Sequence, residues 1–284
     1  MRGVTTASAA TMTQARDGTP ILLRRWTPAG GPWASVVLVH GIAEHSGRYE
    51  AVGSWLADAG LEVLAYDQRG FGGSGGRRAD VDRWERVHDD LEERIEAARA
   101  GAGKRPLVLW GHSLGGLIAL GYCLSAAPRP LPDALVLSAP ALEANIAAWK
   151  VALAPVLAAV APTLAIPNGF ARGILSNDPA VDEAYLADPL VVQRTTARFG
   201  HASFREQRRV REALARLSIP TYVYHGESDA LVPATASEPL GRLPAVTRRT
   251  WTGLRHETHN EAEGREVIAA AVAWLRSVLP STDN

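Results

Sequence analysis

The stretch Leu107-Val108-Leu109-Trp110-Gly111-His112-Ser113-Leu114-Gly115-Gly116 predicts a buried strand, a sharp turn and the start of a helix. Its continuous apolar first half is typical of a strand that is covered on both faces of a sheet. The Gly-x-Ser-x-Gly pattern that follows is typical of a strained turn, at which flanking side chains would clash and the serine hydroxyl is exposed. The first backbone N–H groups of the following helix point towards the serine hydroxyl, where negative charge would develop during the reaction. We therefore expect Ser113 to be a nucleophile.

Strand and helix patterns alternate on both sides of this turn. Besides the strand before Ser113, we expect strands at residues 21–26, 36–40, 62–66, 134–138, 221–225 and 248–251. Helices are expected at residues 49–59, 82–100, 115–126, 235–240 and 261–279. This alternation predicts an α/β fold with a mostly parallel central sheet and helices on both of its faces.

The alternation stops at Pro140, and residues 141–211 contain no convincing strand. Residues 146–166 are apolar, but Lys150, Pro155 and Pro162 interrupt them, which argues against a membrane span. We interpret residues 141–211 as a helical cap inserted into the sheet, with apolar surface that faces a substrate or a lipid interface. Residues 1–15 are expected to be a mobile tail, and residues 16–284 a single domain.

Composition excludes several classes of protein. The 284 residues include 30 basic and 30 acidic side chains, which gives no electrostatic reason to expect a nucleic-acid partner. Cys123 is the only cysteine, so neither an intrachain disulfide nor a structural zinc site held by thiolates is expected, and we interpret it as a small core residue. The N-terminal residues lack the apolar segment of a secretory signal, which predicts a cytoplasmic protein that can bind peripherally to membranes.

A serine nucleophile needs a base and an acid that orients the base. In the architecture predicted here, these come in the order Ser, Asp, His, from loops after later strands. The loop after residue 225 reads Gly226-Glu227-Ser228-Asp229, and the loop after residue 251 reads Thr252-Gly253-Leu254-Arg255-His256. We predict a triad of Ser113, Asp229 and His256. Glu227 and His259 are the local rivals, and Asp229 could instead cap a turn.

The other histidines fit the role of base less well. His225 should lie inside a strand, and His112 stands beside the nucleophile on the turn. His88 and His201 fall in predicted surface or cap helices.

The reaction of a serine nucleophile with an acyl group also needs two donors for the oxyanion. We expect one to be the backbone N–H of Leu114, directly after the nucleophile. The other should come from the His40-Gly41-Ile42 loop after the strand at 36–40, where glycine lets the backbone approach the substrate. The N–H of Ile42 is the predicted second donor.

Three segments together resemble the monoacylglycerol lipases of the α/β-hydrolase superfamily. They are Gly111-His112-Ser113-Leu114-Gly115-Gly116, Asp188-Pro189-Leu190 after Tyr185, and His40-Gly41-Ile42-Ala43-Glu44-His45-Ser46-Gly47-Arg48-Tyr49. The resemblance runs from about residue 35 to residue 279. It implies the α/β-hydrolase fold and the same triad that the residues themselves predict.

The resemblance also implies a site for the glycerol head group, formed by Glu44, Arg48, Tyr185 and His259. An ion pair within the loop and a packed cap tyrosine are the structural alternatives for these residues. One departure is Ile42, where relatives often carry a smaller residue such as alanine.

We therefore expect a serine esterase that hydrolyses monoacylglycerols to fatty acid and glycerol through an acyl-enzyme on Ser113. A lysophospholipase, a broad-specificity carboxylesterase and an inactive homologue that binds a lipid or a partner are the alternatives. The expected substrate is a lipid monoester, and the cap is expected to contact membrane surfaces transiently. No cofactor, metal or obligate protein partner is inferred.

Overall fold

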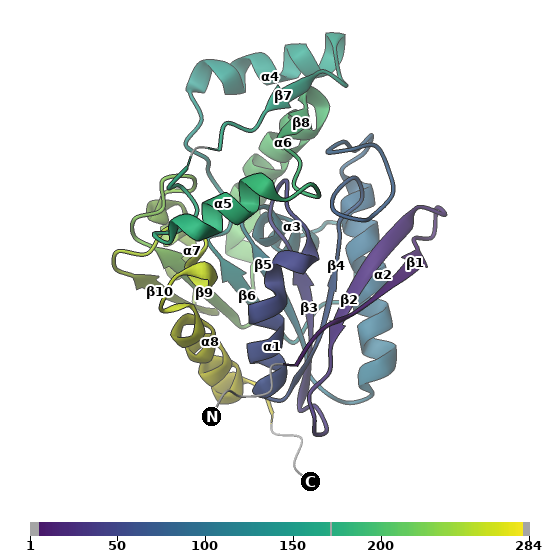
Figure 1. Ribbon diagram of the computed structural model, residues 1–284, viewed down its shortest axis with the longest axis vertical. Coiled ribbons are helices and arrows are strands. Elements are labelled where there is room, and N and C mark those ends of the chain that lie inside the picture. The colour runs from purple at the N-terminus through teal and green to yellow at the C-terminus, as the bar shows by residue number, and fades with distance from the viewer. Residues whose placement is uncertain (1–5, 171, 281–284) are drawn as a thin grey trace.

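The protein is built on one large sheet whose strands are mostly parallel (Figure 1). The structure is a computed structural model that describes residues 6–170 and 172–280. The spatial order of the strands is β1-β2-β4-β3-β5-β6-β9-β10. Within this sheet, as far as the described residues show it, only the β1–β2 and β2–β4 pairs are antiparallel. The strands are β1 (Ala9–Gln14), β2 (Pro20–Trp26), β3 (Ala34–Val39), β4 (Leu61–Tyr66), β5 (Leu107–His112), β6 (Ala134–Ser138), β9 (Thr221–Gly226) and β10 (Val246–Trp251).

Both faces of the central strands are buried, which explains their continuous apolar runs. Successive strand residues point to opposite faces. Leu107 and Leu109 accordingly belong to the core on one face, together with α2 (Glu85–Ala102) and α3 (Leu114–Cys123). Val108 and Trp110 belong to the core on the other face, with α1 (Glu50–Asp58) and α8 (Gly264–Val278). The predicted α/β architecture is confirmed.

Shorter helical elements lie in the loops around this framework. They are the 3-10 helices η1 (Ser46–Tyr49), η3 (Ala234–Ser237) and η4 (Thr258–Asn260), together with the short helix α7 (Glu238–Gly241). The predicted helix at 235–240 is therefore a 3-10 turn that continues into α7. Residues 49–59, predicted as one helix, begin at the end of η1 and continue as α1.

The prediction that residues 1–15 form a tail is wrong for residues 9–14. These residues form β1, which pairs with β2 from Ala9 opposite Arg25 to Gln14 opposite Pro20. Nearly every residue of β1 is exposed, so the strand is held through its backbone rather than through buried side chains. An edge strand of this kind carries no apolar alternation in its sequence. Residues 1–5 of the expected tail lie outside the described residues.

A long insertion separates β6 from β9 and lies at the upper end of the sheet in Figure 1. The expectation that it lacks strands is wrong, because two three-residue strands pair antiparallel within it. Such short, largely exposed strands leave no pattern in the sequence. Its elements are α4 (Ala148–Val160), β7 (Ala165–Pro167), α5 (Pro179–Ala187), β8 (Arg194–Thr196), α6 (Ala197–Ala213) and η2 (Leu214–Arg216).

The two longest helices of the insertion have different surroundings. α6 runs past the predicted boundary at residue 211, and Val210 and Ala213 pack into the sheet core beside α3. α4 continues through Pro155 and leaves large apolar side chains in solvent, with Trp149 65% exposed and Val160 75% exposed. No helix in residues 6–170 or 172–280 is long and apolar enough to cross a membrane.

Candidate active site

Ser113 occupies the tight turn between β5 and α3, with φ +52° and ψ −117°. A non-glycine residue with positive φ is strained and is held there by its surroundings. Close packing of the chain explains the two flanking glycines. A Cβ on Gly111 would lie 2.4 Å from the carbonyl oxygen of Gly115, and one on Gly115 would lie 2.1 Å from that of Val39. The turn therefore requires glycine at both positions and presents the serine at the carboxyl end of β5.

The loops after β9 and β10 bring an acid and a base together. The Nδ1 atom of His256 lies 2.6 Å from Oδ2 of Asp229. The other oxygen, Oδ1, accepts the N–H groups of Leu231 and Val232 at 2.8 and 2.9 Å. His256 and Ser113 line the same cavity. Ser113 and the Asp229-bound His256 thus border one cavity.

Electrostatics couples the two partners. Burial disfavours the ionised form of Asp229, but the charge of His256 and hydrogen bonds from His225 and His256 outweigh it, so the pKa of Asp229 lies below its ordinary range. Burial similarly disfavours a protonated His256. The charge and hydrogen bond of Asp229 reverse that effect and raise the pKa of His256 above 6.5. Asp229 is therefore an anion that makes the imidazole a stronger base.

The rival residues have other surroundings. Glu227 is exposed and accepts the hydroxyl of Thr250 at 2.7 Å. His259 is buried in η4, with its ring stacked 5.2 Å from that of Tyr49. His88 was expected in a surface helix, but it is buried, and its Nε2 lies 3.2 Å from Oε1 of Glu206 in α6. A carboxylate on a helix distant in sequence explains that difference.

The two predicted oxyanion donors also border the cavity. Ile42 and Leu114 line it together with Ser113. Among the residues described, neither backbone N–H has a protein acceptor. A Cβ on Gly41 would lie 2.8 Å from Oε1 of Glu44 and 3.3 Å from the Cβ of Ser113, so this loop also approaches the nucleophile closely.

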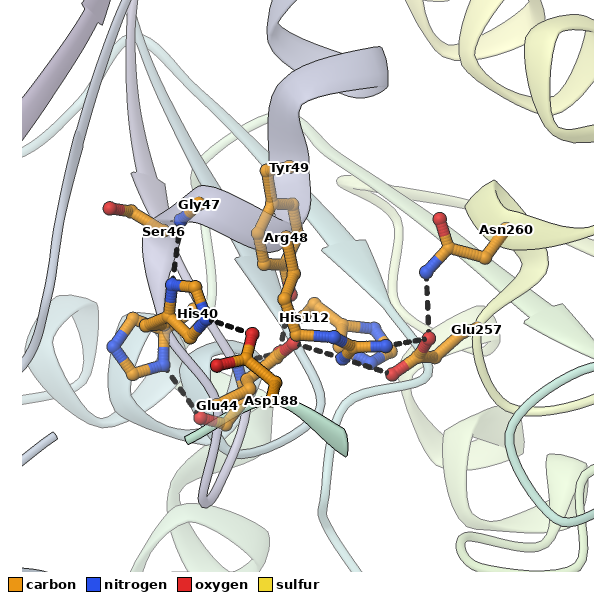
Figure 2. A network of polar contacts seen from close by, with 12 residues as sticks. His40, Glu44, Ser46, Gly47, Arg48, Tyr49, His112, Asp188, Glu257 and Asn260 are labelled. Carbon is orange, nitrogen blue, oxygen red and sulfur yellow. Dashed lines mark hydrogen bonds and ion pairs between the residues drawn. The ribbon is translucent and has the colours of Figure 1, made fainter. Parts of the chain in front are cut away.

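Two of the predicted head-group residues, Glu44 and Arg48, belong to a buried ionic network, which Figure 2 shows. Oε1 of Glu44 accepts the N–H of Gly41 at 2.6 Å and the hydroxyl of Tyr49 at 2.7 Å. Arg48 donates to Oε2 of Glu44 at 2.5 Å and makes a two-pronged contact with Glu257 at 2.6 and 2.8 Å. The ion pair that the sequence left as an alternative is therefore present, and it includes a second carboxylate.

Sequence reasoning missed Glu257. Burial raises the pKa of a carboxyl group, but the guanidinium of Arg48 outweighs it here, and the pKa of Glu257 falls to about 2. The amide of Asn260 adds a hydrogen bond at 2.7 Å. The sequence indicates Glu257 only by its position, as an acidic residue directly after the candidate base His256. Its partner stands 209 positions earlier in the chain, so the pairing could not be read from spacing.

Tyr185 lies on α5 of the cap, directly over Arg48. The guanidinium carbon of Arg48 is 4.8 Å from the centre of its ring. Its hydroxyl is buried and has no hydrogen-bond partner within the described part of the chain. Of the four predicted head-group residues, Glu44 and Tyr185 line the cavity. Arg48 and His259 are not among the lining residues in the described structure; Arg48 contacts Glu44, and His259 stacks on Tyr49.

The cavity has a volume of about 720 Å³ and joins a polar floor to apolar walls. The floor includes Ser113, His112, His256, Glu44 and Glu257. The walls come mostly from the cap, and they include Trp149, Leu153, Leu157, Ile166, Phe170 and Phe204. A cavity of this kind suits a molecule with one polar end and one long apolar end.

The fold, the strained serine turn and the Asp–His pair define an α/β-hydrolase. Residues 30–263 match the family model described as serine aminopeptidase, S33. The chain is 35% identical to a monoacylglycerol lipase from Mycolicibacterium smegmatis, over 92% of this chain and 95% of that protein. It is 32% identical to the human monoglyceride lipase, over 86% of this chain and 82% of that protein. The chain belongs to the monoacylglycerol lipase family, which confirms the resemblance seen in its motifs.

A solved structure agrees with this membership. The crystal structure of the Paleococcus ferrophilus monoacylglycerol lipase is 31% identical, with a TM-score of 0.79 over 90% of this chain and 99% of that one.

Proposed function

We propose that this protein hydrolyses monoacylglycerols to a fatty acid and glycerol, with Ser113, His256 and Asp229 as its catalytic triad. One observation carries the proposal. The serine and the Asp229-paired histidine border a cavity that is polar at the floor and apolar along the cap. Membership of the lipase family supports the same substrate class.

In the proposed mechanism, His256 takes the proton of Ser113 as the serine oxygen attacks the ester carbonyl carbon. Asp229 holds the imidazole in the correct tautomer and stabilises the imidazolium. The N–H groups of Ile42 and Leu114 donate to the oxyanion of the tetrahedral intermediate. When the ester C–O bond breaks, the glycerol oxygen takes the proton from His256, and the acyl group remains on the serine.

Water completes the cycle. His256 removes a proton from water as the water oxygen attacks the acyl-enzyme, and a second tetrahedral intermediate forms in the same oxyanion site. Its collapse returns the proton to Ser113 and releases the fatty acid. These steps use side chains, backbone N–H groups and water.

For the glycerol end of the substrate, we propose Tyr185 and Glu44 as direct hydrogen-bonding partners. The Tyr185 hydroxyl is buried without a partner in the described residues, so a substrate hydroxyl would satisfy it. Arg48 and His259 would act indirectly, by holding Glu44 and Tyr49 in place. Neither residue lines the cavity in the described structure, which supports this division.

The same network favours a neutral head group over a phosphate. The positive charge of Arg48 is balanced by the carboxylates of Glu44 and Glu257. Burial lowers the pKa of His259, so that this imidazole supplies no positive charge at neutral pH. An anionic phosphoryl group at this end would therefore face excess negative charge. This argues for a monoacylglycerol rather than a lysophospholipid.

We further propose that the exposed apolar side chains of α4 contact lipid surfaces transiently. Trp149, Val156 and Val160 are at least half exposed on this helix. An apolar helix face beside the opening of a lipid-binding cavity would draw substrate from an interface.

A substrate panel tests the proposal. Purified protein would be assayed with monoacylglycerols, lysophospholipids and short p-nitrophenyl esters. We expect the highest kcat/KM with a monoacylglycerol. A clear preference for a lysophospholipid would overturn the substrate assignment, and no turnover of any ester would mean that the chain is an inactive homologue.

Tyr185→Phe tests the head-group assignment, because it removes only one hydroxyl. Loss of a hydrogen bond to a neutral group corresponds to roughly a 3- to 10-fold fall in kcat/KM. We expect this fall for a monoacylglycerol and no change for a p-nitrophenyl ester, which lacks glycerol. An equal change with both esters would contradict a contact with the head group.

A further inference from the structure

The candidate acid Asp229 is shared by two histidines. Its Oδ2 atom lies 2.6 Å from Nδ1 of His256 and 3.1 Å from Nε2 of His225. His225 belongs to β9 and is completely buried. It is absent from the residues that line the cavity in the described structure, so it can influence the reaction only through its neighbours.

The surroundings of His225 assign the proton on its Nε2 atom. That atom faces two acceptors, Oδ2 of Asp229 at 3.1 Å and the carbonyl oxygen of Val232 at 2.9 Å. An unprotonated nitrogen would oppose two further lone pairs in a site without access to water, which is costly. The Nε2–H group therefore donates, and its bond is divided between Asp229 and Val232.

The other side of the ring is anchored. Nδ1 of His225 lies 3.1 Å from Oγ of Ser237. This oxygen accepts the Nε–H of Arg248 at 2.9 Å, from the neighbouring strand β10, and the Ser237 hydroxyl lies 2.9 Å from the carbonyl oxygen of Ala234. The ring is thus fixed at both nitrogens, and its contact with Asp229 has a defined direction.

We propose that His225 is a positioning residue for Asp229, which orients the carboxylate towards His256 and withdraws part of its negative charge. The inference rests on the proposed triad and extends it by a fourth side chain. With the amides of Leu231 and Val232 on Oδ1, the Nε2–H of His225 gives each carboxylate oxygen a fixed donor besides the catalytic histidine. The carboxylate then has a single orientation before substrate arrives.

Two consequences follow from loss of this donor. The carboxylate becomes less well oriented, which lowers kcat without affecting the binding of substrate. Asp229 also presents more negative charge to His256, which favours the protonated imidazole and raises the pKa of His256. His256 then loses its proton, and can act as a base, only at a higher pH.

The experiment compares His225→Asn with His225→Gln. An asparagine amide reaches the position of Nδ1, near Ser237, and leaves Asp229 without its donor. A glutamine amide reaches the position of Nε2 and keeps an N–H directed at Oδ2. The two variants thus differ in the one contact that the proposal concerns, and both keep a polar side chain in the buried site.

For His225→Asn with a monoacylglycerol, we expect kcat to fall roughly 10- to 100-fold with KM unchanged, as for a hydrogen bond to a charged group. The acidic limb of the kcat/KM profile should move upwards by roughly 0.5 pH unit or more. His225→Gln should keep most of the activity and the original limb. The other ionisable groups near His256 are unchanged in both variants, namely His112, His259, Glu44 and Glu257.

Equal kcat losses in both variants with an unmoved acidic limb would overturn the proposal, since they indicate a packing role alone. If His225→Asn does not fold, nitrogen NMR of the wild-type histidines decides the matter. The proposal requires a protonated Nε2 on His225 at pH 7, and an unprotonated one overturns it. Full activity of Asp229→Ala would instead refute the triad itself, so the two failures are distinguishable.

Discussion

The carboxyl end of the sheet and the cap contribute to the site in different ways. At the sheet, the chain is held by backbone geometry. Ser113 has a positive φ, and glycines 111 and 115 have no room for a Cβ. In the cap, α4 buries little of its apolar surface, and Val160 is 75% exposed. The candidate chemistry therefore depends on a precisely placed backbone, whereas the proposed fit to a lipid depends on the apolar side chains of the cap.

The largest effect is expected at the nucleophile. Ser113→Ala removes the attacking oxygen and should lower kcat by roughly 10⁴-fold or more, with the cavity and fold intact. Turnover of a monoacylglycerol and a thermal melt check this. Ser277→Ala, at an exposed serine of α8, is the control and should leave both unchanged. Comparable activity in the two variants would exclude Ser113 as nucleophile.

The next effect concerns the turn itself. In Gly115→Ala, the new Cβ would approach the carbonyl oxygens of Val39 and His40 at 2.1 and 2.5 Å, neither of which can move cheaply. We expect a loss of about 3 kcal/mol in the free energy of unfolding. Gly101→Ala is the matched control, because its Cβ meets nothing within 4 Å and it lies in α2. It should stabilise the protein slightly, by up to about 1 kcal/mol. Chemical denaturation measures both, and equal stability would disprove a backbone constraint at position 115.

The third prediction concerns the effect of pH on the Asp229–His256 pair. His256 must be neutral to act as a base, and Asp229 raises its pKa above 6.5. The value of kcat/KM should therefore rise with pH and reach half of its maximum above pH 6.5. In Asp229→Asn, the remaining activity should show this midpoint at lower pH, because the carboxylate charge is gone. A midpoint that does not move would show that another group titrates.

The smallest effect is expected in the cap. Replacing Val156 and Val160 together by serine removes apolar surface that is already exposed, so stability should change by less than about 0.5 kcal/mol. Binding to lipid vesicles, measured by co-sedimentation, should weaken roughly 5- to 10-fold. Hydrolysis of a dissolved short ester should not change. Leu131→Ser, at an exposed leucine outside the cap, is the control, and an equal loss of vesicle binding there would exclude a specific role for α4.

The parts of the fold that could be predicted are those in which local sequence and packing agree. The strand before Ser113 is apolar because both of its faces are covered, and its turn carries glycines because nothing larger fits. β1 could not be predicted, because an exposed edge strand depends on backbone pairing with β2. The strands β7 and β8 have three residues each, too few for a periodic pattern.

Some residues of the candidate site could likewise be predicted from the sequence, and others could not. The order of the motifs led to Asp229 and His256, because each follows a recognisable strand. The role of Glu257 depends on Arg48, which stands in a loop at the other end of the sequence. The second histidine on Asp229 was also hidden, since His225 reads as an ordinary strand residue until the loop after β9 folds back over it.

One contact restricts how this protein can be re-engineered. The carbonyl oxygen of Ala43, directly after the proposed oxyanion donor Ile42, accepts the N–H of Val192 at 2.8 Å. Nearby, Nε2 of His45 lies 2.8 Å from Oδ2 of Asp188. The segment after α5 is therefore a support for the oxyanion loop as well as part of the cap. A chimaera with a cap from another protein should therefore retain residues 188–192. Without them, the loop that carries the proposed oxyanion donor Ile42 loses its support, and catalytic activity should fall.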